Sequence, residues 1–170
     1  VKIAAGPAHC AAIDNEGHVL TWGNNGGWYD GGGQLGHGNT DSLNTPKYIE
    51  SFSAYGAKAA HVSLGTQHTL ILTTDGEVLA CGHGEYGRIG TGNLENVETP
   101  ETVEVLVDET ITQVSAGNSF SMALSESGNV YTWGKNDTGQ LGIKDTMIDI
   151  YSMETYPQLI DIKGFFKETP

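Results

Sequence analysis

The chain repeats itself, and this property constrains its possible folds more than any single motif does. Three sets of glycines recur along the sequence, and in each set the separations are 59 and 52 residues. The sets are Gly6, Gly65 and Gly117, then Gly17, Gly76 and Gly128, and finally Gly23, Gly82 and Gly134. Self-similarity at a fixed period indicates a repeat architecture, in which each copy is one supersecondary unit. The sequence therefore predicts three copies of one unit, at about residues 1–59, 60–111 and 112–170.

Each copy is expected to form four short strands. The second and third strands make a hairpin around the turn glycine, because glycine adopts a positive φ without steric cost. These hairpins are expected at 8–14 with 18–22, at 68–74 with 77–81, and at 120–126 with 129–133. A first strand precedes each hairpin, most clearly at 60–64 and 111–115, and a fourth follows the proline, at 48–49 and 103–107. No segment shows a sustained helical period with capping residues, so no helix is expected.

Four short antiparallel strands per copy, with glycine and tryptophan at fixed offsets, predict an all-β fold built from β-propeller blades. A propeller closes with roughly four to eight blades, so three blades cannot form a ring. The remaining blades are expected in further parts of a longer chain or in another copy; otherwise the piece is an open arc. The first residue is Val1 at a repeat boundary, and we therefore expect the sequence to be a fragment.

The third copy resembles the repeat of the RCC1 family, the regulators of chromosome condensation and their relatives. Its matching residues are Val114-Ser115-Ala116-Gly117, Ala123-Leu124, Gly128, Val130-Tyr131, Trp133-Gly134, Asn136 and Gly139-Gln140-Leu141-Gly142. The other copies match less densely, and the departures are Phe120 for histidine, Cys81 for tryptophan, and Arg88-Ile89 for glutamine-leucine. The resemblance covers nearly the whole chain and implies a seven-bladed propeller. It implies no single function, because a fold does not determine one.

Charge excludes some classes of partner. Lysine and arginine total 8 against 21 aspartates and glutamates, so the net charge is −13. Binding to nucleic acid depends on cationic groups that displace counterions from the phosphates, and an anionic membrane attracts the same groups. We therefore expect neither, and a basic protein partner fits better. No apolar run approaches membrane-spanning length, and the two cysteines suggest no disulfide framework, which favours a reducing, intracellular compartment, cytoplasmic or nuclear.

No motif predicts catalysis, a cofactor or a metal site. Residues 82–87 match the G-x-G-x-x-G dinucleotide pattern, but no helix is expected after them and the repeat explains their glycines. His9 and His68 share one repeat position, so we expect each to be a structural histidine that bonds a neighbouring strand. The family's ultraviolet photoreceptor carries tryptophan just after the early glycine, where this chain has Pro7, Thr66 and Asn118. The sequence thus predicts a protein that is not an enzyme.

The positions at which the copies differ are the candidate binding sites. An insert at 24–33 carries Trp28, Tyr29 and Asp30 among glycines, and aromatic side chains are favoured anchors in protein interfaces. The corresponding loops of the other copies carry Glu85 and Tyr86, and Asp137. A second insert, at 145–156, adds Met147, Ile150 and Tyr151. Either insert could instead fold back on its own blade.

Three functions are compatible with these features. The first is a non-catalytic scaffold or adaptor that binds protein partners, suggested by the acidic surface and the loop aromatics. The alternative, which the family resemblance implies, is a guanine-nucleotide exchange factor for a small Ran-like GTPase. A further alternative from the same resemblance is the partner-binding propeller of a larger ubiquitin ligase or ciliary assembly.

Overall fold

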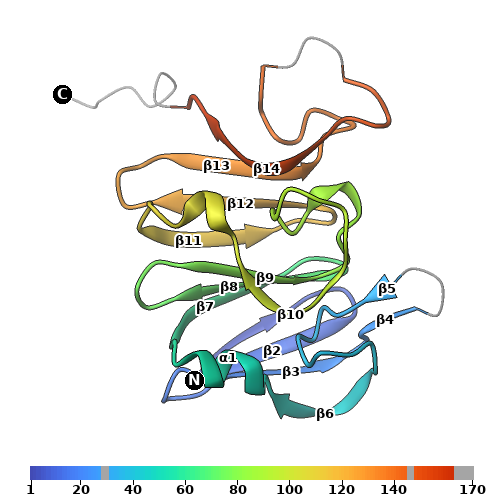
Figure 1. Ribbon diagram of the computed structural model, residues 1–170, viewed down its shortest axis with the longest axis vertical. Coiled ribbons are helices and arrows are strands. Elements are labelled where there is room, and N and C mark those ends of the chain that lie inside the picture. The colour runs from blue at the N-terminus through green and yellow to red at the C-terminus, as the bar shows by residue number, and fades with distance from the viewer. Residues whose placement is uncertain (28–30, 145–147, 163–170) are drawn as a thin grey trace.

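The computed structural model describes residues 1–27, 31–144 and 148–162, and in them the chain forms three four-stranded antiparallel sheets (Figure 1). The first sheet contains β1 (Lys2–Ala5), β2 (His9–Ile13), β3 (Val19–Gly23) and β6 (Leu43–Tyr48). The second contains β7 (Ala59–Leu64), β8 (His68–Thr73), β9 (Val78–Gly82) and β10 (Val97–Thr102). The third contains β11 (Ile111–Ala116), β12 (Phe120–Ser125), β13 (Val130–Lys135) and β14 (Met153–Ile160). The predicted all-β architecture of propeller blades is confirmed.

Within each sheet the strands follow one another in chain order, and the sheets stack along the long axis of the molecule. The first strands of adjacent sheets, β1, β7 and β11, lie against one another. The last strands, β6, β10 and β14, form the opposite edges and carry Pro46, Pro100 and Pro157. Proline lacks the N–H that a central strand donates, so it is confined to such edges. We call this side of each blade the rim.

The β2–β3 hairpin shows how the repeated glycine directs a turn. Gly17 adopts a φ of 89°, and Ile13 pairs with Val19 across the hairpin. Asp14 Oδ1 accepts hydrogen bonds of 2.9 Å from the backbone N–H groups of Glu16 and His18. Such a side-chain turn replaces the backbone bonds that the reversing chain cannot make.

Two details of the predicted secondary structure are wrong. The fourth strands precede the expected positions: β6 ends at Tyr48, and β10 ends at Thr102. The segment after β10 instead forms the short 3₁₀ helix η2 (Glu104–Leu106). The prediction placed these strands after the prolines, whereas an edge strand accommodates a proline within it.

A helix that was not expected, α1 (Glu50–Tyr55), connects the first two blades. It has six residues, too few to show a helical period, and it ends at Gly56 with a φ of 81°. The buried Phe52 is its anchor to the core. In the described residues no helix is long and apolar enough to cross a membrane.

The hydrophobic cores lie between the sheets. One joins the first and second blades and includes Ile13, Ile49 and Ile71; the other joins the second and third and includes Leu70, Ile89 and Trp133. Because adjacent blades bury the facing sides of their sheets against each other, each core depends on two copies of the repeat.

A polar contact recurs in both cores. His9 Nε2 lies 2.9 Å from Thr69 Oγ1 in the next blade, and the Thr69 hydroxyl donates a 2.7 Å bond to the carbonyl of Gln34. The hydroxyl donates its only hydrogen to that carbonyl, so its oxygen must accept from His9 Nε2, which therefore carries the proton.

The same arrangement joins the second and third blades. His68 Nε2 lies 2.9 Å from Ser121 Oγ, which donates a 2.9 Å bond to the carbonyl of Arg88. Trp133 Nε1 donates to the same carbonyl at 3.0 Å. We call each set an inter-blade lock. The predicted structural role of the two histidines is confirmed.

Candidate functional site

The long loops gather at one end of the sheets. They are the β3–β6, β9–β10 and β13–β14 connections, and they appear on the right of Figure 1. Hydrogen bonds tie the start of each loop to the turn before the second strand of its blade. These bonds join Asn24 N to Ala8 O at 2.9 Å, His83 N to Gln67 O at 2.8 Å, and Lys135 N to Ser119 O at 2.9 Å. We call this end, with these loops and turns, the loop face.

The first insert is only partly described. Trp28, Tyr29 and Asp30 lie outside the described residues, so the structure does not test the prediction for them. The segments on either side, β4 (Gly26–Gly27) and β5 (Gly31–Gly32), pair antiparallel.

Buried asparagines at one repeat position shape the loops. Asn25 Oδ1 accepts bonds from the N–H groups of Gly33 at 3.2 Å and Leu35 at 2.9 Å. In the third blade Asn136 Oδ1 accepts from Leu141 N at 3.1 Å. These bonds satisfy backbone groups that would otherwise be unpaired in the loops, so the described parts of the loop face have a defined shape.

Tyr86 lies in the 3₁₀ turn η1 (Glu85–Gly87) with an unusual backbone. Its φ is 61° and its ψ is 8°, and among the described residues it alone has a positive φ without being glycine. This conformation costs a non-glycine residue roughly 1–2 kcal/mol. The phenol ring lies close to two cations: Lys135 Nζ is 4.8 Å from the ring centroid, and Arg88 Cζ is 5.6 Å from it. Both distances are within the range of a cation–π interaction.

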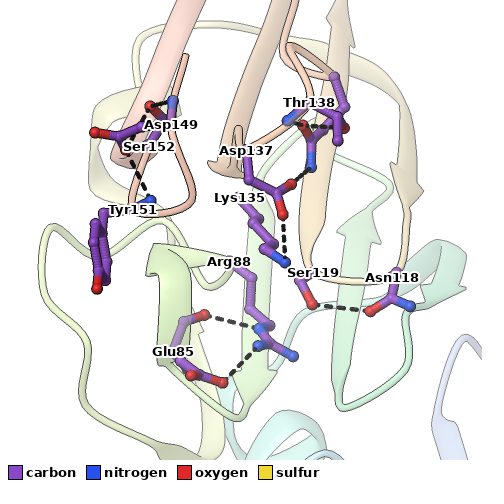
Figure 2. A network of polar contacts seen from close by, with 11 residues as sticks. Glu85, Arg88, Asn118, Ser119, Lys135, Asp137, Thr138, Asp149, Tyr151 and Ser152 are labelled. Atoms are coloured by element: carbon purple, nitrogen blue, oxygen red, sulfur yellow. Dashed lines mark hydrogen bonds and ion pairs between the residues drawn. The ribbon is translucent and has the colours of Figure 1, made fainter. Parts of the chain in front are cut away.

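Arg88 is almost completely buried beside Tyr86, with a side chain 2% exposed. Its Nε donates a 2.8 Å bond to the carbonyl of Glu85. Its terminal nitrogens make only long contacts. One reaches the Glu85 carboxylate at 3.5 Å (Figure 2), and another reaches Gln67 Oε1 at 3.4 Å. Burial lowers the pKa of Arg88, whereas the charge of Glu85 opposes that change. A buried cation with long contacts retains the capacity to attract an additional acceptor.

The third blade adds a close ion pair to the same cluster. Lys135 Nζ lies 2.7 Å from Asp137 Oδ2, and Gln140 Nε2 donates to Asp137 Oδ1 at 3.0 Å (Figure 2). The bond between them raises the pKa of Lys135 and lowers the pKa of Asp137. Glu85 and Tyr86 come from a loop that lies one repeat, 52 residues, before the loop of Asp137. The structure brings them together at the boundary between two blades. We call Glu85, Tyr86, Arg88, Lys135 and Asp137 the boundary cluster.

The second insert projects two apolar side chains into solvent. Ile150 is 70% exposed and Tyr151 is 75% exposed. They protrude from a turn in which Asp149 Oδ1 accepts a 2.8 Å bond from Tyr151 N (Figure 2). The carbonyl of Ser152 in the same turn accepts a 2.7 Å bond from Asn136 N. Ile150 and Tyr151 are therefore not buried against the blade edge. Met147 lies outside the described residues.

Sequence reasoning missed Arg88 and Lys135 as members of the site. In the sequence Arg88 is only a departure from the repeat pattern. Its place in the cluster depends on the packing of the next blade. Lys135 follows the repeated tryptophan and glycine, at a position that varies between the copies. The sequence signal for this site is the arginine at position 88, where the repeat pattern has glutamine. A cation at a buried repeat position requires nearby acceptors or negative charge to offset the loss of hydration.

A hollow of about 720 Å³ lies at the opposite end of the first blade, lined by Asp14, Glu16, His18 and Tyr48 among others. Partial desolvation of the Asp14 carboxyl acts to raise its pKa, but hydrogen bonds from His18 and Glu16 outweigh it and lower the pKa to about 2. Asp14 is thus already used in the turn. The described residues contain no group of three or more histidine, cysteine, aspartate or glutamate side chains arranged to hold a metal ion.

Stacked four-stranded blades, with loops at one end that carry a charged and aromatic cluster, define part of a β-propeller of the repeat type. The sequence matches the family described as "Regulator of chromosome condensation (RCC1) repeat" at residues 16–72, 75–124 and 127–167. A second pattern with the same description matches residues 1–27, 59–88 and 111–140. The chain belongs to the RCC1 repeat family.

Several curated relatives are much longer than this chain. It is 38% identical over 144 residues to the human E3 ubiquitin-protein ligase HERC2, covering 84% of this chain and 3% of HERC2. It is 35% identical to the Xenopus laevis serine/threonine-protein kinase Nek9, covering 95% of this chain and 17% of Nek9. It is 36% identical to the Arabidopsis thaliana ultraviolet-B receptor UVR8, covering 85% of this chain and 31% of UVR8. The chain therefore spans less than a third of each of these relatives.

Solved structures confirm the fold. Human WBSCR16 matches with a TM-score of 0.78 at 24% identity, over 96% of this chain and 40% of that chain. Prp20p from Saccharomyces cerevisiae matches with a TM-score of 0.78 at 22% identity, over 96% of this chain and 38% of that chain. At these identities the likeness concerns the architecture alone.

Proposed function

We propose that this chain is a non-catalytic protein-interaction platform, and that its loop face binds the partner. The observation that supports this most directly is Tyr86, which has a strained backbone conformation and a ring close to both Lys135 and Arg88. Strained residues gather at binding sites, where the surrounding structure stabilises them. Tyrosine and arginine are also the residue types enriched among the energetic anchors of interfaces.

The two parts of the proposed surface have complementary roles. The boundary cluster provides charged groups of both signs, and one of them, Arg88, is buried beneath the surface. Ile150 and Tyr151 provide exposed apolar area. Together they resemble the apolar core and polar rim of a protein interface. The net charge of −13 favours a basic partner and disfavours nucleic acid.

Structural relatives support binding of proteins as a class of function. The published description of Prp20p concerns its binding to Gsp1p and histones, and another structure contains yeast RCC1 (Prp20) bound to Kap60. These two structures do not identify the partner of this chain, because their sequence identity to it is 22%. We include in the proposal further propeller blades from the same or another chain, and an intracellular location, cytoplasmic or nuclear. The free thiols of Cys10 and Cys81 are compatible with a reducing compartment.

A second candidate is the partner-binding propeller of a larger ubiquitin ligase, which the 38% identity to HERC2 favours. The alternative function is nucleotide exchange on a small Ran-like GTPase, which would also act by binding a protein. A nucleotide-release assay with a panel of small GTPases tests it: accelerated release would establish an exchange factor. An unchanged release rate across the panel would support the scaffold.

A capture experiment tests the loop face. The immobilised chain, the Tyr86→Ala variant and the Ile150→Ala/Tyr151→Ala variant would each be incubated with lysate, and captured proteins would be quantified by mass spectrometry. Val107→Ala is the matched control, because Val107 is 51% exposed but lies beside η2. Proteins that bind the loop face should be lost at least tenfold from both loop-face variants and retained by the control. A set of partners that all three variants retain equally would refute the proposed surface.

A further inference from the structure

A groove lies on the rim of the second blade, where the end of the β9–β10 loop approaches α1 and β10. It encloses about 500 Å³ between α1, β10, η2 and a side chain of β14. Among its lining residues are Phe52, Tyr55, Pro100, Glu101, Glu104 and Tyr156. We call it the rim groove, and α1 lies beside β10 in Figure 1. Its volume is within the range of binding pockets, roughly 300–1,000 Å³.

The rim groove has a fixed apolar floor and two aromatic walls. Phe52 and Leu79 form the floor and are buried in the inter-blade core. Tyr55, at the end of α1, and Tyr156, on β14, are 59% and 48% exposed. Val105 adds a third apolar side chain with about half of its surface exposed. Exposed aromatic and aliphatic groups around a concave surface mark a binding site more often than scattered ones do.

Contacts within the fold hold the Tyr156 wall in position. Its ring lies over Gly92, where a Cβ atom would be 2.0 Å from Tyr156 Cζ. Gly92 has a φ of 86°, and its N–H donates a 3.0 Å bond to the carbonyl of Thr155. The tyrosine therefore depends on a glycine beneath it, and the groove wall is formed before any ligand arrives. A preformed wall reduces the entropy lost on binding.

The rim groove is acidic and lacks positive charge. Glu101 and Glu104 line it and are exposed, and no described residue forms an ion pair with either. None of its lining residues is a lysine or arginine. Two unpaired carboxylates beside apolar walls favour an occupant that carries cationic groups next to apolar ones.

The backbone of β10 limits how a peptide can bind. β10 is an edge strand, and edge strands commonly bind peptides by strand addition. Pro100 interrupts the row of N–H donors in the middle of β10, so a long added strand is disfavoured. Thr91 Oγ1, also in the lining, is buried without a hydrogen-bond partner among the described atoms. Recognition in the rim groove therefore depends on side chains, and the Thr91 hydroxyl is available to hydrogen-bond with a ligand.

We propose that the rim groove binds a short basic and apolar peptide segment of a partner protein, with an apolar side chain between the tyrosines and cationic side chains at the glutamates. The lining of the rim groove contains no residue of the boundary cluster and neither Ile150 nor Tyr151. The groove therefore extends the proposed platform to a second binding surface. Nucleic acid is disfavoured by the carboxylates, which repel phosphate.

Fluorescence anisotropy tests the proposal with defined probes. The probes are fluorescein-labelled hexapeptides of alternating arginine and leucine, of arginine alone, and of alternating glutamate and leucine. We expect the arginine-leucine peptide to bind at least fivefold more tightly than the arginine peptide, and the glutamate-leucine peptide not to bind. Raising the salt from 50 to 300 mM should weaken binding several-fold, because the carboxylates are exposed to screening.

Variants distinguish the rim groove from general attraction to an acidic protein. Glu101→Gln/Glu104→Gln and Tyr55→Ala should each weaken binding of the arginine-leucine peptide about tenfold. The control Asp75→Asn/Glu126→Gln makes the same change in net charge at two hairpin turns, and it should change binding less than twofold. Equal effects of the two double variants, or equal affinity for all three peptides, would overturn the proposal. Circular dichroism of each variant confirms that it is folded.

The proposals for the loop face and for the rim groove can be tested independently of each other. Tyr86→Ala lies on the loop face and should leave binding of the arginine-leucine peptide unchanged. Conversely, Tyr55→Ala should leave capture of loop-face partners unchanged. Loss of peptide binding in Tyr86→Ala would show that the peptide occupies the loop face, and it would overturn the assignment to the rim groove.

Discussion

The inter-blade locks predict that this protein loses stability in mild acid. Burial lowers the pKa of His9 from 6.5 to about 4, and burial, together with the charge of Arg88, lowers the pKa of His68 to about 3. Both imidazoles are therefore neutral in the folded chain at pH values where the unfolded chain has already bound protons. Stability is complete above pH 6.5 and is lost progressively as the pH falls from 6.5 towards 4.

The size of the loss follows from the shift. One pKa unit corresponds to about 1.4 kcal/mol, so the shift of His9 represents about 3 kcal/mol, and that of His68 is at least as large. Small domains have total stabilities of roughly 5–15 kcal/mol. We therefore expect most of the stability of the three-blade chain to be lost by pH 4. The carboxylate of Asp14, with a pKa of about 2, loses its contribution only as the pH falls below about 4, so the two effects can be separated.

Urea unfolding, followed by tryptophan fluorescence between pH 4 and 8, measures this loss. The decisive variant is His9→Phe/His68→Phe, because the chain itself carries Phe120 at the same repeat position in the third blade. The variant should be less stable than the native chain at pH 8, by about 1 kcal/mol for each lost hydrogen bond. Its stability should change little between pH 6.5 and 4.5.

A matched control is His61→Gln, since His61 is exposed on β7 and takes no part in a lock. It should keep the native pH dependence. The reasoning is refuted if the native chain is equally stable at pH 6.5 and 4.5. It is refuted equally if the double phenylalanine variant retains the native slope.

Three further outcomes are expected. Trp133→Ala removes a fully buried indole from the core between the second and third blades and should cost about 3–5 kcal/mol in urea unfolding; a cost below 1 kcal/mol would contradict the packing described. Burial raises the pKa of the Cys81 thiol to about 12, so a thiol reagent at pH 8 should modify the half-buried Cys10 first and Cys81 only on unfolding; equal rates would show that the core opens readily. Lys135→Met breaks the bridge to Asp137 at a partly exposed site and should cost less than about 1 kcal/mol, a cost that should shrink in high salt.

The repeat pattern determined the architecture in advance, because its signals are local. The glycine at each hairpin is required by the positive φ of its own turn, as Gly17 shows. The alternation of apolar runs and turns likewise depends on a few adjacent residues. His9 and His68 were assigned correctly, because a histidine recurring at one repeat position points to a role that the repeat itself requires.

Errors arose where tertiary packing outweighed local pattern. The fourth strand of the second blade contains Pro100, which is tolerated only because that strand lies at a sheet edge. The six residues of α1 are helical because Phe52 packs into the core between two blades. Neither property can be recognised in a short sequence window.

The sequence by itself determined the family, the three blades and the loops in which binding residues should be sought. Only the tertiary structure decided which of those residues meet. Tyr86, Arg88 and Lys135 come together because the second and third blades pack side by side. The rim groove, between Tyr55 and Tyr156, likewise requires elements that follow the first blade and end the third. Contacts between copies depend on how the blades stack, and that information is absent from the pattern within any one copy.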